Sequence, residues 1–265
     1  MQRILATHPD AFPLVETYMF SRRIGLGALF SGVPATDAGA PSRYAPPGIG
    51  RLFDRDELVL ETRAIALAWL RAGVGTEPRF AIEKSPWHLH ELGLIAEVLP
   101  EARFVSVLRD GRDVAVSLVH ARRSWSGWGQ REASAVVAEA ARSWRAGLSL
   151  LARAAPVLGS NLLEVRFEDL KTDPHAAVRR LFAHCGMPYT AADVGRAVES
   201  TDFARQPGPS GPGEIRRTGR VGEWRERFGI ADCRRFERIA GDLLRERGYE
   251  SDPRWWLRQP LRSRL

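Results

Sequence analysis

The chain has 265 residues, of which 44% are hydrophobic, 39 are basic and 32 are acidic. This length is enough for one sizeable α/β domain, and because no linker divides the chain, we expect a single domain spanning residues 1–265. The net charge of +7 favours an anionic partner, but basic and acidic residues alternate along most of the chain. That pattern indicates local anion-binding pockets and argues against a nucleic-acid-binding tail.

The cysteines and the apolar runs indicate in which cellular compartment the protein is found. Cys185 and Cys233 have the spacing of neither a metal site nor a disulfide framework, which is typical of a reducing compartment. No apolar run approaches the ~18 residues that a membrane span needs. The amino-terminal MQRILATHPD lacks the hydrophobicity of a signal peptide. We therefore expect a cytoplasmic protein with no metal ion and no transmembrane segment.

Helices and strands are predicted to alternate along the chain. The first helix should end at His8-Pro9, because proline disfavours helical geometry in the residue before it. Further helices are predicted at 56–71, 87–98, from 113, 134–154, 175–185 and 231–248. Short apolar runs predict strands at 79–84, 103–109 and 161–167. This alternation indicates an α/β fold: a parallel sheet flanked by helices on both faces, with ligands at the carboxyl ends of the strands.

Two carboxyl-terminal segments differ in composition from the rest. Residues 204–222 combine proline and glycine with a basic end, so we expect a mobile loop that brings positive charge to a ligand. Residues 250–265 form a basic tail with two tryptophans. Such a tail can dock a partner or a membrane surface, but packing on its own domain is the commoner outcome.

Arg109 stands where the predicted strand FVSVL ends and a helix begins at Asp110-Gly111. The first N–H groups and the dipole of that helix add positive potential at the strand end. Ser117 lies two helical turns further on and can face the same side. Together they can offer a bidentate guanidinium and a hydroxyl to a phosphate. The alternative is an arginine–aspartate pair that only caps the helix, with Ser117 as a small packing residue.

Lysine occurs only at Lys84 and Lys171, and arginine supplies the remaining positive side-chain charge. A compact ammonium and a planar guanidinium serve different purposes, so a lysine directly after a predicted strand indicates a chemical role for Lys84. For Lys171, retention as an ordinary surface residue is the better interpretation. In the later stretch IRRTGRVGEW, arginines such as Arg217 can close over an anion, and Gly219 permits close backbone approach.

These segments resemble the sulfotransferases that use 3′-phosphoadenosine-5′-phosphosulfate. The resemblance depends on EKSP before a helix, LPEARF leading into RDGRDVAVS, VRFEDL-x-x-DP, and R-x-G-x-x-G-x-W, in that order over about residues 1–230. It implies a P-loop NTPase-like fold and transfer of a sulfuryl group from this donor to a hydroxyl or amine. By analogy with phosphoryl transfer, positioning and charge stabilisation would carry the catalysis.

The resemblance also implies roles for individual residues in donor binding. Arg109 and Ser117 match the family's contacts to the 3′-phosphate, and Arg217 with Gly219 match the late loop that covers the nucleotide. Phe167 stands where the family often has a tyrosine beside the adenine. The phenylalanine can stack but offers no hydroxyl, and a core position at the strand end is the alternative.

For catalysis, Lys84 matches a lysine placed near the bridging oxygen of the transferred group, where a cation stabilises the transition state more than the ground state. The histidine that cytosolic members carry two residues later is Pro86 here. His88 and His90 are displaced from that position, with surface or capping roles as the alternative. Glu16 matches a glutamate that serves as the base in other members, provided that burial raises its pKa.

The family's amino-terminal strand and phosphosulfate-binding loop have no counterpart in this sequence, because Met1 stands where that loop should end. We expect either that the natural start lies upstream or that the chain is truncated and binds the donor weakly. A non-catalytic protein that binds 3′,5′-bisphosphoadenosine is therefore the alternative function. A nucleic-acid-binding protein is disfavoured because no reader motif is present. The acceptor, whether small molecule, carbohydrate, lipid or peptide, and the oligomeric state stay open.

Overall fold

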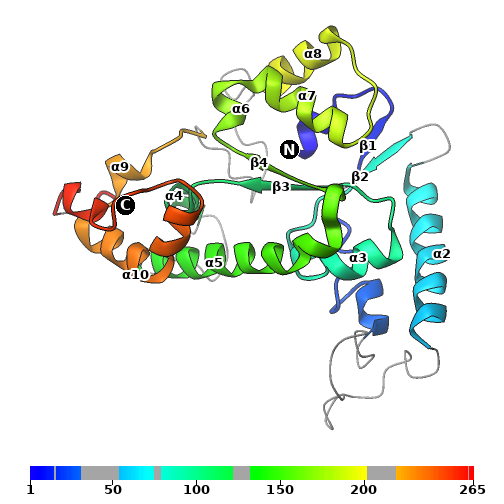
Figure 1. Ribbon diagram of the computed structural model, residues 1–265, viewed down its shortest axis with the longest axis horizontal. Helices are drawn as coiled ribbons and strands as arrows, with labels where there is room; N and C mark the ends of the chain where they lie inside the picture. The colour runs from blue at the N-terminus through cyan, green and yellow to red at the C-terminus, as the bar shows by residue number, and fades with distance from the viewer. Residues whose placement is uncertain (15, 31–53, 75–78, 122–131, 202–218, 262) are drawn as a thin grey trace. The chain divides into compact units, whose positions relative to one another are not determined.

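The computed structural model (Figure 1) describes residues 1–14, 16–30, 54–74, 79–121, 132–201, 219–261 and 263–265. The chain divides into two compact units. The first unit comprises residues 1–106, 150–164 and 175–198, and the second comprises 107–149, 165–174 and 199–265.

The first unit contains a two-stranded parallel sheet. Strand β1 (Ala11–Pro13) pairs in parallel with β2 (Phe80–Ile82), with Ala11 opposite Phe80 and Pro13 opposite Ile82. The N–H of Leu14 continues the ladder by donating to the carbonyl of Ile82 over 2.8 Å. The short helix α1 (Gln2–Leu5) precedes β1, and the Gln2 amide donates to the Leu14 carbonyl over 2.5 Å. This register brings the residues after β1 and β2 to the same edge of the sheet.

Helices surround one apolar core of the first unit. Its buried side chains come from the 3₁₀ helix η1 (Leu26–Phe30), from α2 (Arg55–Val74) and from α3 (Leu92–Val98). The predicted helix 87–98 is divided into a 3₁₀ helix, η3 (Pro86–His90), and α3. The division falls at Glu91, whose φ of −120° is not helical and whose buried carboxylate pairs with Arg22. The unit also contains most of α7 (Pro174–His184), which the sequence pattern predicted, and of α8 (Ala191–Thr201), which it did not.

A second sheet consists of β3 (Phe104–Leu108) and β4 (Leu162–Arg166). The N–H of Phe167 donates to the carbonyl of Leu108 over 2.7 Å, so pairing persists to the ends of both strands. The α/β class is confirmed. The described strands nevertheless form two small sheets, whereas the alternation pattern suggested a single larger one. Hydrophobic periodicity locates strands, but it does not specify which strands pair.

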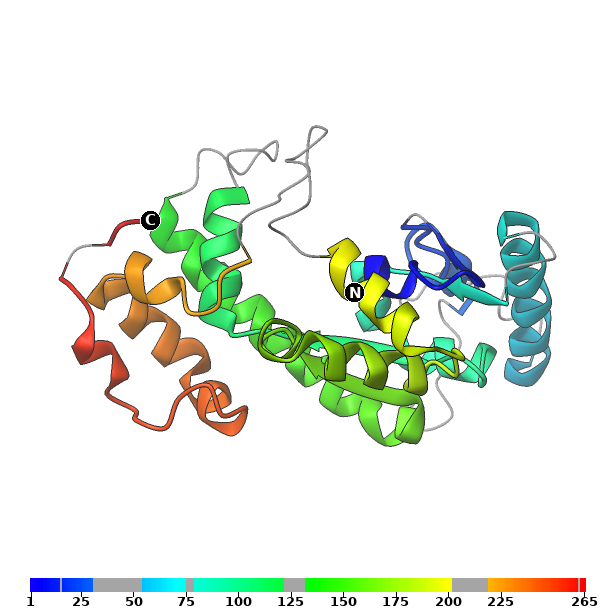
Figure 2. The same ribbon diagram turned by 90° about the horizontal axis from the view of Figure 1, so that it is seen from above.

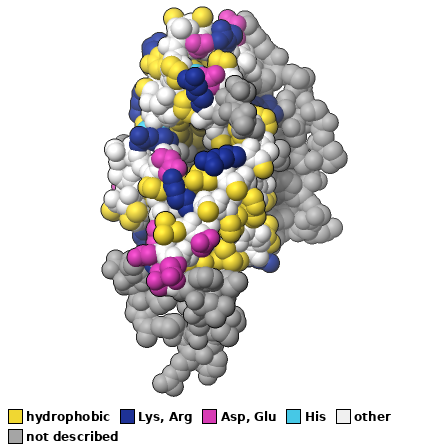
Figure 3. All heavy atoms as spheres, turned by 90° about the vertical axis from the view of Figure 1, so that its right-hand side faces the viewer, with side chains coloured by type: hydrophobic (Ala, Val, Ile, Leu, Met, Phe, Trp, Pro, Cys, Tyr) yellow, Lys and Arg dark blue, Asp and Glu magenta, His cyan; other side chains and the backbone are white. Residues whose placement is uncertain are grey.

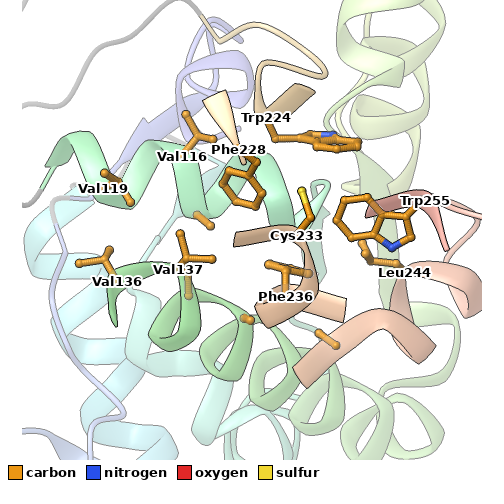
Figure 4. Close-up of a cluster of buried hydrophobic side chains, with 14 residues drawn as sticks. Val116, Val119, Val136, Val137, Trp224, Phe228, Cys233, Phe236, Leu244 and Trp255 are labelled. Carbon is orange, nitrogen blue, oxygen red and sulfur yellow. The ribbon is translucent and has the colours of Figure 1, made fainter. Parts of the chain in front are cut away.

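The second unit is built around an apolar core shown in Figure 4. It contains α4 (Gly111–Ala121), the first part of α5 (Ala133–Leu158), α6 (Asp169–Thr172), α9 (Trp224–Arg227), α10 (Ile230–Glu246) and the 3₁₀ helix η5 (Trp255–Arg258). Val116, Val137 and Phe236 meet in this core from three different helices. In Figure 2, η5 (red) lies against α10 (orange). Trp255 is only 1% exposed, so the tryptophan-containing tail packs on its own unit.

The surface carries charges of both signs. On the face drawn in Figure 3, basic, acidic and hydrophobic side chains are interspersed. This arrangement agrees, for that face, with the alternation of charge along the sequence. Among the described residues, no helix combines the length and the apolar composition that crossing a bilayer requires.

Candidate functional site

The second unit brings together three of the predicted site residues, Arg109, Ser117 and Phe167. Arg109 follows β3 directly and Phe167 follows β4 directly, so the pairing of the two strand ends brings both residues together. The Arg109 guanidinium carbon lies 4.5 Å from the centroid of the Phe167 ring. Its Nη1 donates to the Ser117 hydroxyl over 3.4 Å, and its Nη2 donates to the carbonyl of Arg220 over 3.1 Å. We call Arg109, Ser117 and Phe167 the arginine cluster.

The Arg109 guanidinium has donor capacity left for an anion. A guanidinium carries five N–H donors, and its Nε is buried with no partner among the described residues. Nη1 and Nη2 carry two N–H groups each and make one hydrogen bond each to the described residues, so a ligand oxygen can accept from the N–H groups that remain. Lys171 adds a second cation, since its Nζ lies 5.7 Å from the Phe167 ring. The cluster therefore fits a phosphate next to a flat ring.

Asp113, in the first turn of α4, anchors the segment that returns to this cluster. Its buried carboxylate accepts hydrogen bonds from the N–H of Gly222 over 2.7 Å and from the N–H of Trp224 over 3.0 Å. Burial raises the pKa of this carboxyl, although the two N–H donors act in the opposite direction. Gly219 and Gly222 have φ values of +55° and +76°, a region that glycine adopts without strain. Sequence reasoning missed Asp113, for which the only signal was an acidic residue at the start of a helix.

Trp144 of α5 fixes the backbone of Arg109. The indole N–H of Trp144 donates to the carbonyl of Arg109 over 3.0 Å. This approach requires glycine at position 111, because a Cβ atom there would lie 2.6 Å from the Trp144 ring and 2.7 Å from Phe236. Gly111 therefore permits the close packing that orients the strand end.

Arg112, three residues after Arg109, forms a buried network of ion pairs with Asp110 and Glu250. Its guanidinium binds Asp110 through Nε at 3.0 Å and Nη2 at 2.8 Å, and its Nη1 lies 3.2 Å from Oε2 of Glu250. The same guanidinium lies 3.8 Å from the Trp224 ring and 4.6 Å from the Trp255 ring. Asp110 therefore pairs with Arg112, and the alternative of an Arg109–Asp110 cap gains no support from these contacts.

In the first unit, Lys84 and Glu16 form an ion pair at the edge of the β1–β2 sheet. We call them the lysine–glutamate pair. The Tyr18 hydroxyl donates to the second carboxylate oxygen of Glu16 over 3.1 Å. The two side chains are 52% and 35% exposed, and the hydrogen bond from Lys84 holds the pKa of Glu16 below its ordinary value. This direction is opposite to the burial-driven rise that would suit Glu16 to act as a base near neutral pH.

Glu83 fixes the chain on both sides of this pair. Its Oε1 accepts the N–H of Thr17 over 2.9 Å, the Thr17 hydroxyl over 2.7 Å and the Ser85 hydroxyl over 3.2 Å. Nδ1 of His88 lies 3.1 Å from Oε2 of Glu83. Burial alone would raise the pKa of Glu83, but the contacts with His88 and Thr17 outweigh it and lower the pKa. His88 therefore contacts Glu83 and helps to keep its carboxylate ionised. Sequence reasoning did not single out Glu83.

The remaining predicted residues are placed as follows. His90 stacks at a tilt with Trp87, with ring centroids 5.9 Å apart. Gly219 is at the start of the described segment that Asp113 anchors, whereas Arg217 and most of the predicted loop lie outside the described residues. In the described part of the chain, no three His, Cys, Asp or Glu side chains gather as a metal-ligand set.

Comparisons with known proteins point to one family. The sequence profile described as "Sulfotransferase family" matches residues 1–191. The fold is similar to that of mouse sulfotransferase SULT7A1 complexed with PAP, with a TM-score of 0.54 and 15% identity, over 97% of this chain and 92% of the other. It is also similar to retinol dehydratase in complex with androsterone and the inactive cofactor PAP, with a TM-score of 0.51 and 20% identity, over 76% and 67% of the two chains. No curated protein sequence matches significantly.

Proposed function

The chain belongs to the sulfotransferase family, and on this premise we propose that it transfers a sulfuryl group from 3′-phosphoadenosine-5′-phosphosulfate to a hydroxyl or amine acceptor. The donor supplies the activated sulfuryl group and a nucleoside bisphosphate as leaving group. The observation that carries the proposal is the arginine cluster, in which a guanidinium with further N–H donors lies beside a hydroxyl and a ring at two paired strand ends. The family match runs through residues of both units, which supports the predicted single domain.

Arg109 and Ser117 are proposed to bind the 3′-phosphate of the donor. A guanidinium and a hydroxyl that already lie 3.4 Å apart can contact oxygens of one phosphate without rearrangement. Phe167 is proposed to stack with the adenine, a role that its position at the end of β4 supports. Gly219 and Arg217 are proposed to cover the nucleotide, and the hydrogen bonds of Asp113 to the following residues would keep the end of that segment in place.

Lys84 is proposed as the catalytic cation. Its ammonium would stabilise the negative charge that develops on the leaving group as the sulfuryl bond breaks. In the structure it neutralises Glu16, so binding of the donor would exchange one anionic partner for another. This exchange removes the interaction that lowers the pKa of Glu16 and restores its capacity to accept a proton from the acceptor. Glu16 is therefore the proposed base, and Lys84 controls the pKa of its carboxyl.

The acceptor is proposed to be a small organic molecule. The support is that retinol dehydratase, a protein of similar fold, was solved in complex with androsterone. We also propose a cytoplasmic location, which two cysteines present as free thiols support.

Calorimetric titration with 3′,5′-bisphosphoadenosine tests the donor site. Arg109→Ala should weaken binding by about 10-fold or more, because charge-assisted hydrogen bonds contribute about 1.5–3 kcal/mol each. Arg109→Lys keeps the positive charge but loses the planar pair of N–H donors, so its affinity for the nucleotide should lie between those of the wild type and Arg109→Ala. Arg142→Ala is the matched control, because it removes an exposed arginine of the same unit that pairs with Glu139.

Two results would separate the alternatives. Equal affinities of the wild type and Arg109→Ala would remove the proposed donor site. Tight binding without transfer of labelled sulfate from the donor to any of a panel of phenols, alcohols and amines would favour the non-catalytic nucleotide-binding protein.

A further inference from the structure

A pocket of about 430 Å³ lies on the second unit between α10 and η5. It is lined by Ala231, Arg234, Arg235, Glu237, Arg238 and Trp256. None of these residues belongs to the arginine cluster or to the lysine–glutamate pair. The volume is within the range of about 300–1,000 Å³ that is typical of small-molecule sites. We call it the α10 pocket.

The pocket carries uncompensated positive charge. Arg234, Arg235 and Arg238 come from little more than one turn of α10, and no described carboxylate forms an ion pair with any of them. The only acidic residue in the lining is Glu237. Its carboxylate is already engaged, because it accepts from Nη1 of Arg245 over 2.6 Å and from the indole N–H of Trp255 over 2.8 Å. Three guanidinium groups are thus available to a ligand.

One wall of the pocket is aromatic and held in place. The guanidinium carbon of Arg234 lies 5.0 Å from the ring centroid of Trp256, a cation–π distance. Trp256 is half-buried and packs against the core of the unit, and the neighbouring Trp255 is fully buried. Through the bond from Trp255 to Glu237, η5 is tied to the helix that carries the arginines. The Trp256 ring is therefore held beside the arginine-bearing face of α10 before any ligand arrives.

This combination defines the chemistry of the ligand. Guanidinium groups match the geometry of phosphate and sulfate oxygens, to which they can donate two parallel hydrogen bonds. A fixed indole offers a flat apolar surface to a ring. We propose that the α10 pocket binds an organic sulfate or phosphate ester whose anionic group contacts Arg234 and Arg238 and whose ring lies against Trp256.

The proposal can be tested with 4-nitrophenyl sulfate and 4-nitrophenyl phosphate as probes, titrated calorimetrically into the full chain. The double variant Arg234→Ala/Arg238→Ala should weaken binding of both esters by about 10-fold or more, since it removes two charge-assisted contacts. Arg142→Ala, an exposed arginine of the same unit, should leave the affinity unchanged. The same loss should be measured when Arg234→Ala/Arg238→Ala is introduced into an Arg109→Ala background, in which the proposed donor site no longer competes for the esters, so failure of this proposal is distinguishable from failure of the proposed donor site.

4-Nitroanisole, which keeps the ring but has no anionic group and no hydroxyl, should bind much more weakly than either ester, and Trp256→Ala should reduce the preference for the esters over inorganic sulfate. Circular dichroism and thermal unfolding of each variant verify that it folds. Three outcomes would overturn the proposal: no ester binding by the wild type at millimolar concentration, equal affinity for the ester and for inorganic sulfate, or undiminished binding by the folded double variant.

Discussion

The arginine cluster and the lysine–glutamate pair hold their cations in different ways. Arg109 is supported by packed groups: the partly buried Trp144 donates to its carbonyl, and the nearby Arg112 is fully buried against two tryptophan rings and bound to Asp110. Lys84 is half exposed and is paired with the carboxylate of Glu16. The backbone around that pair is fixed by the hydrogen bonds of Glu83, and the Glu16 carboxylate also accepts from the Tyr18 hydroxyl.

The difference indicates that the arginine cluster is built for binding an anion in a fixed geometry, whereas the lysine–glutamate pair can change partners during the reaction. A binding site for a phosphate gains from a cation that is already oriented, because less conformational entropy is lost when the ligand arrives. A cation that must stabilise developing charge has to leave its resting partner, and an exposed ion pair costs little to break. Each of the following predictions tests one side of this comparison, in order of decreasing expected effect.

Replacing Arg112 with methionine should cause the largest loss of stability. It would leave the buried carboxylate of Asp110 without its bidentate partner, and breaking a buried ion pair from one side costs about 3–5 kcal/mol. Urea unfolding measures this loss, and Arg142→Ala, which breaks an exposed pair, should change stability by less than about 0.5 kcal/mol. A small effect of Arg112→Met would show that the buried network does not support the second unit.

Replacing Lys84 with methionine should impair activity strongly and stability hardly at all. Loss of a group that stabilises transition-state charge lowers turnover by about 100- to 1,000-fold. Because Lys84 is 52% exposed, unfolding by urea should be nearly unchanged, and binding of 3′,5′-bisphosphoadenosine should persist. Lys84→Arg, which keeps the charge in a different shape, should recover only part of the activity. Full activity of Lys84→Met would exclude the catalytic role.

Glu83→Gln should destabilise the first unit by about 1–2 kcal/mol at neutral pH, because several donors share this carboxylate. The pKa of Glu83 is lowered, so the stability that it contributes is present above the ordinary pKa of 4.5 and is lost as the pH falls through the lowered pKa. The variant should therefore show a flatter acid limb in a plot of stability against pH. Glu61→Gln, at an exposed position of α2, is the control, and identical acid limbs for Glu83→Gln and the wild type would contradict the assignment.

Phe167→Leu should have the smallest effect among these variants. A ring beneath a guanidinium contributes about 0.5–1 kcal/mol at an exposed site, which corresponds to about a 2- to 5-fold loss of affinity for 3′,5′-bisphosphoadenosine. Phe167→Tyr keeps the ring and should bind at least as well as the wild type. If the tyrosine variant lost as much affinity as the leucine variant, ring contact with Arg109 and the nucleotide would not be the role of this position.

Part of this site follows from local sequence alone. The β-branched run before Arg109 predicts a strand, the apolar spacing after Gly111 predicts a helix, and the cation between them must then stand at a strand end. The same reasoning located Lys84 after β2, and the confirmed α/β class follows from the alternation of such elements. These inferences succeed because hydrophobic periodicity and turn residues act over a few neighbouring positions.

Contacts between residues that are far apart in the chain were decided by the tertiary structure alone. The sequence RDGRD does not reveal that its second arginine is buried against two tryptophans more than 100 residues away, or that the Asp113 carboxylate accepts a hydrogen bond from Gly222. Likewise, Glu16 carries a lowered pKa because folding brings it to Lys84, 68 positions later. Local sequence thus predicts which strand ends carry charged residues. The pKa values and orientations of those side chains depend on distant groups, which only folding brings within hydrogen-bonding distance.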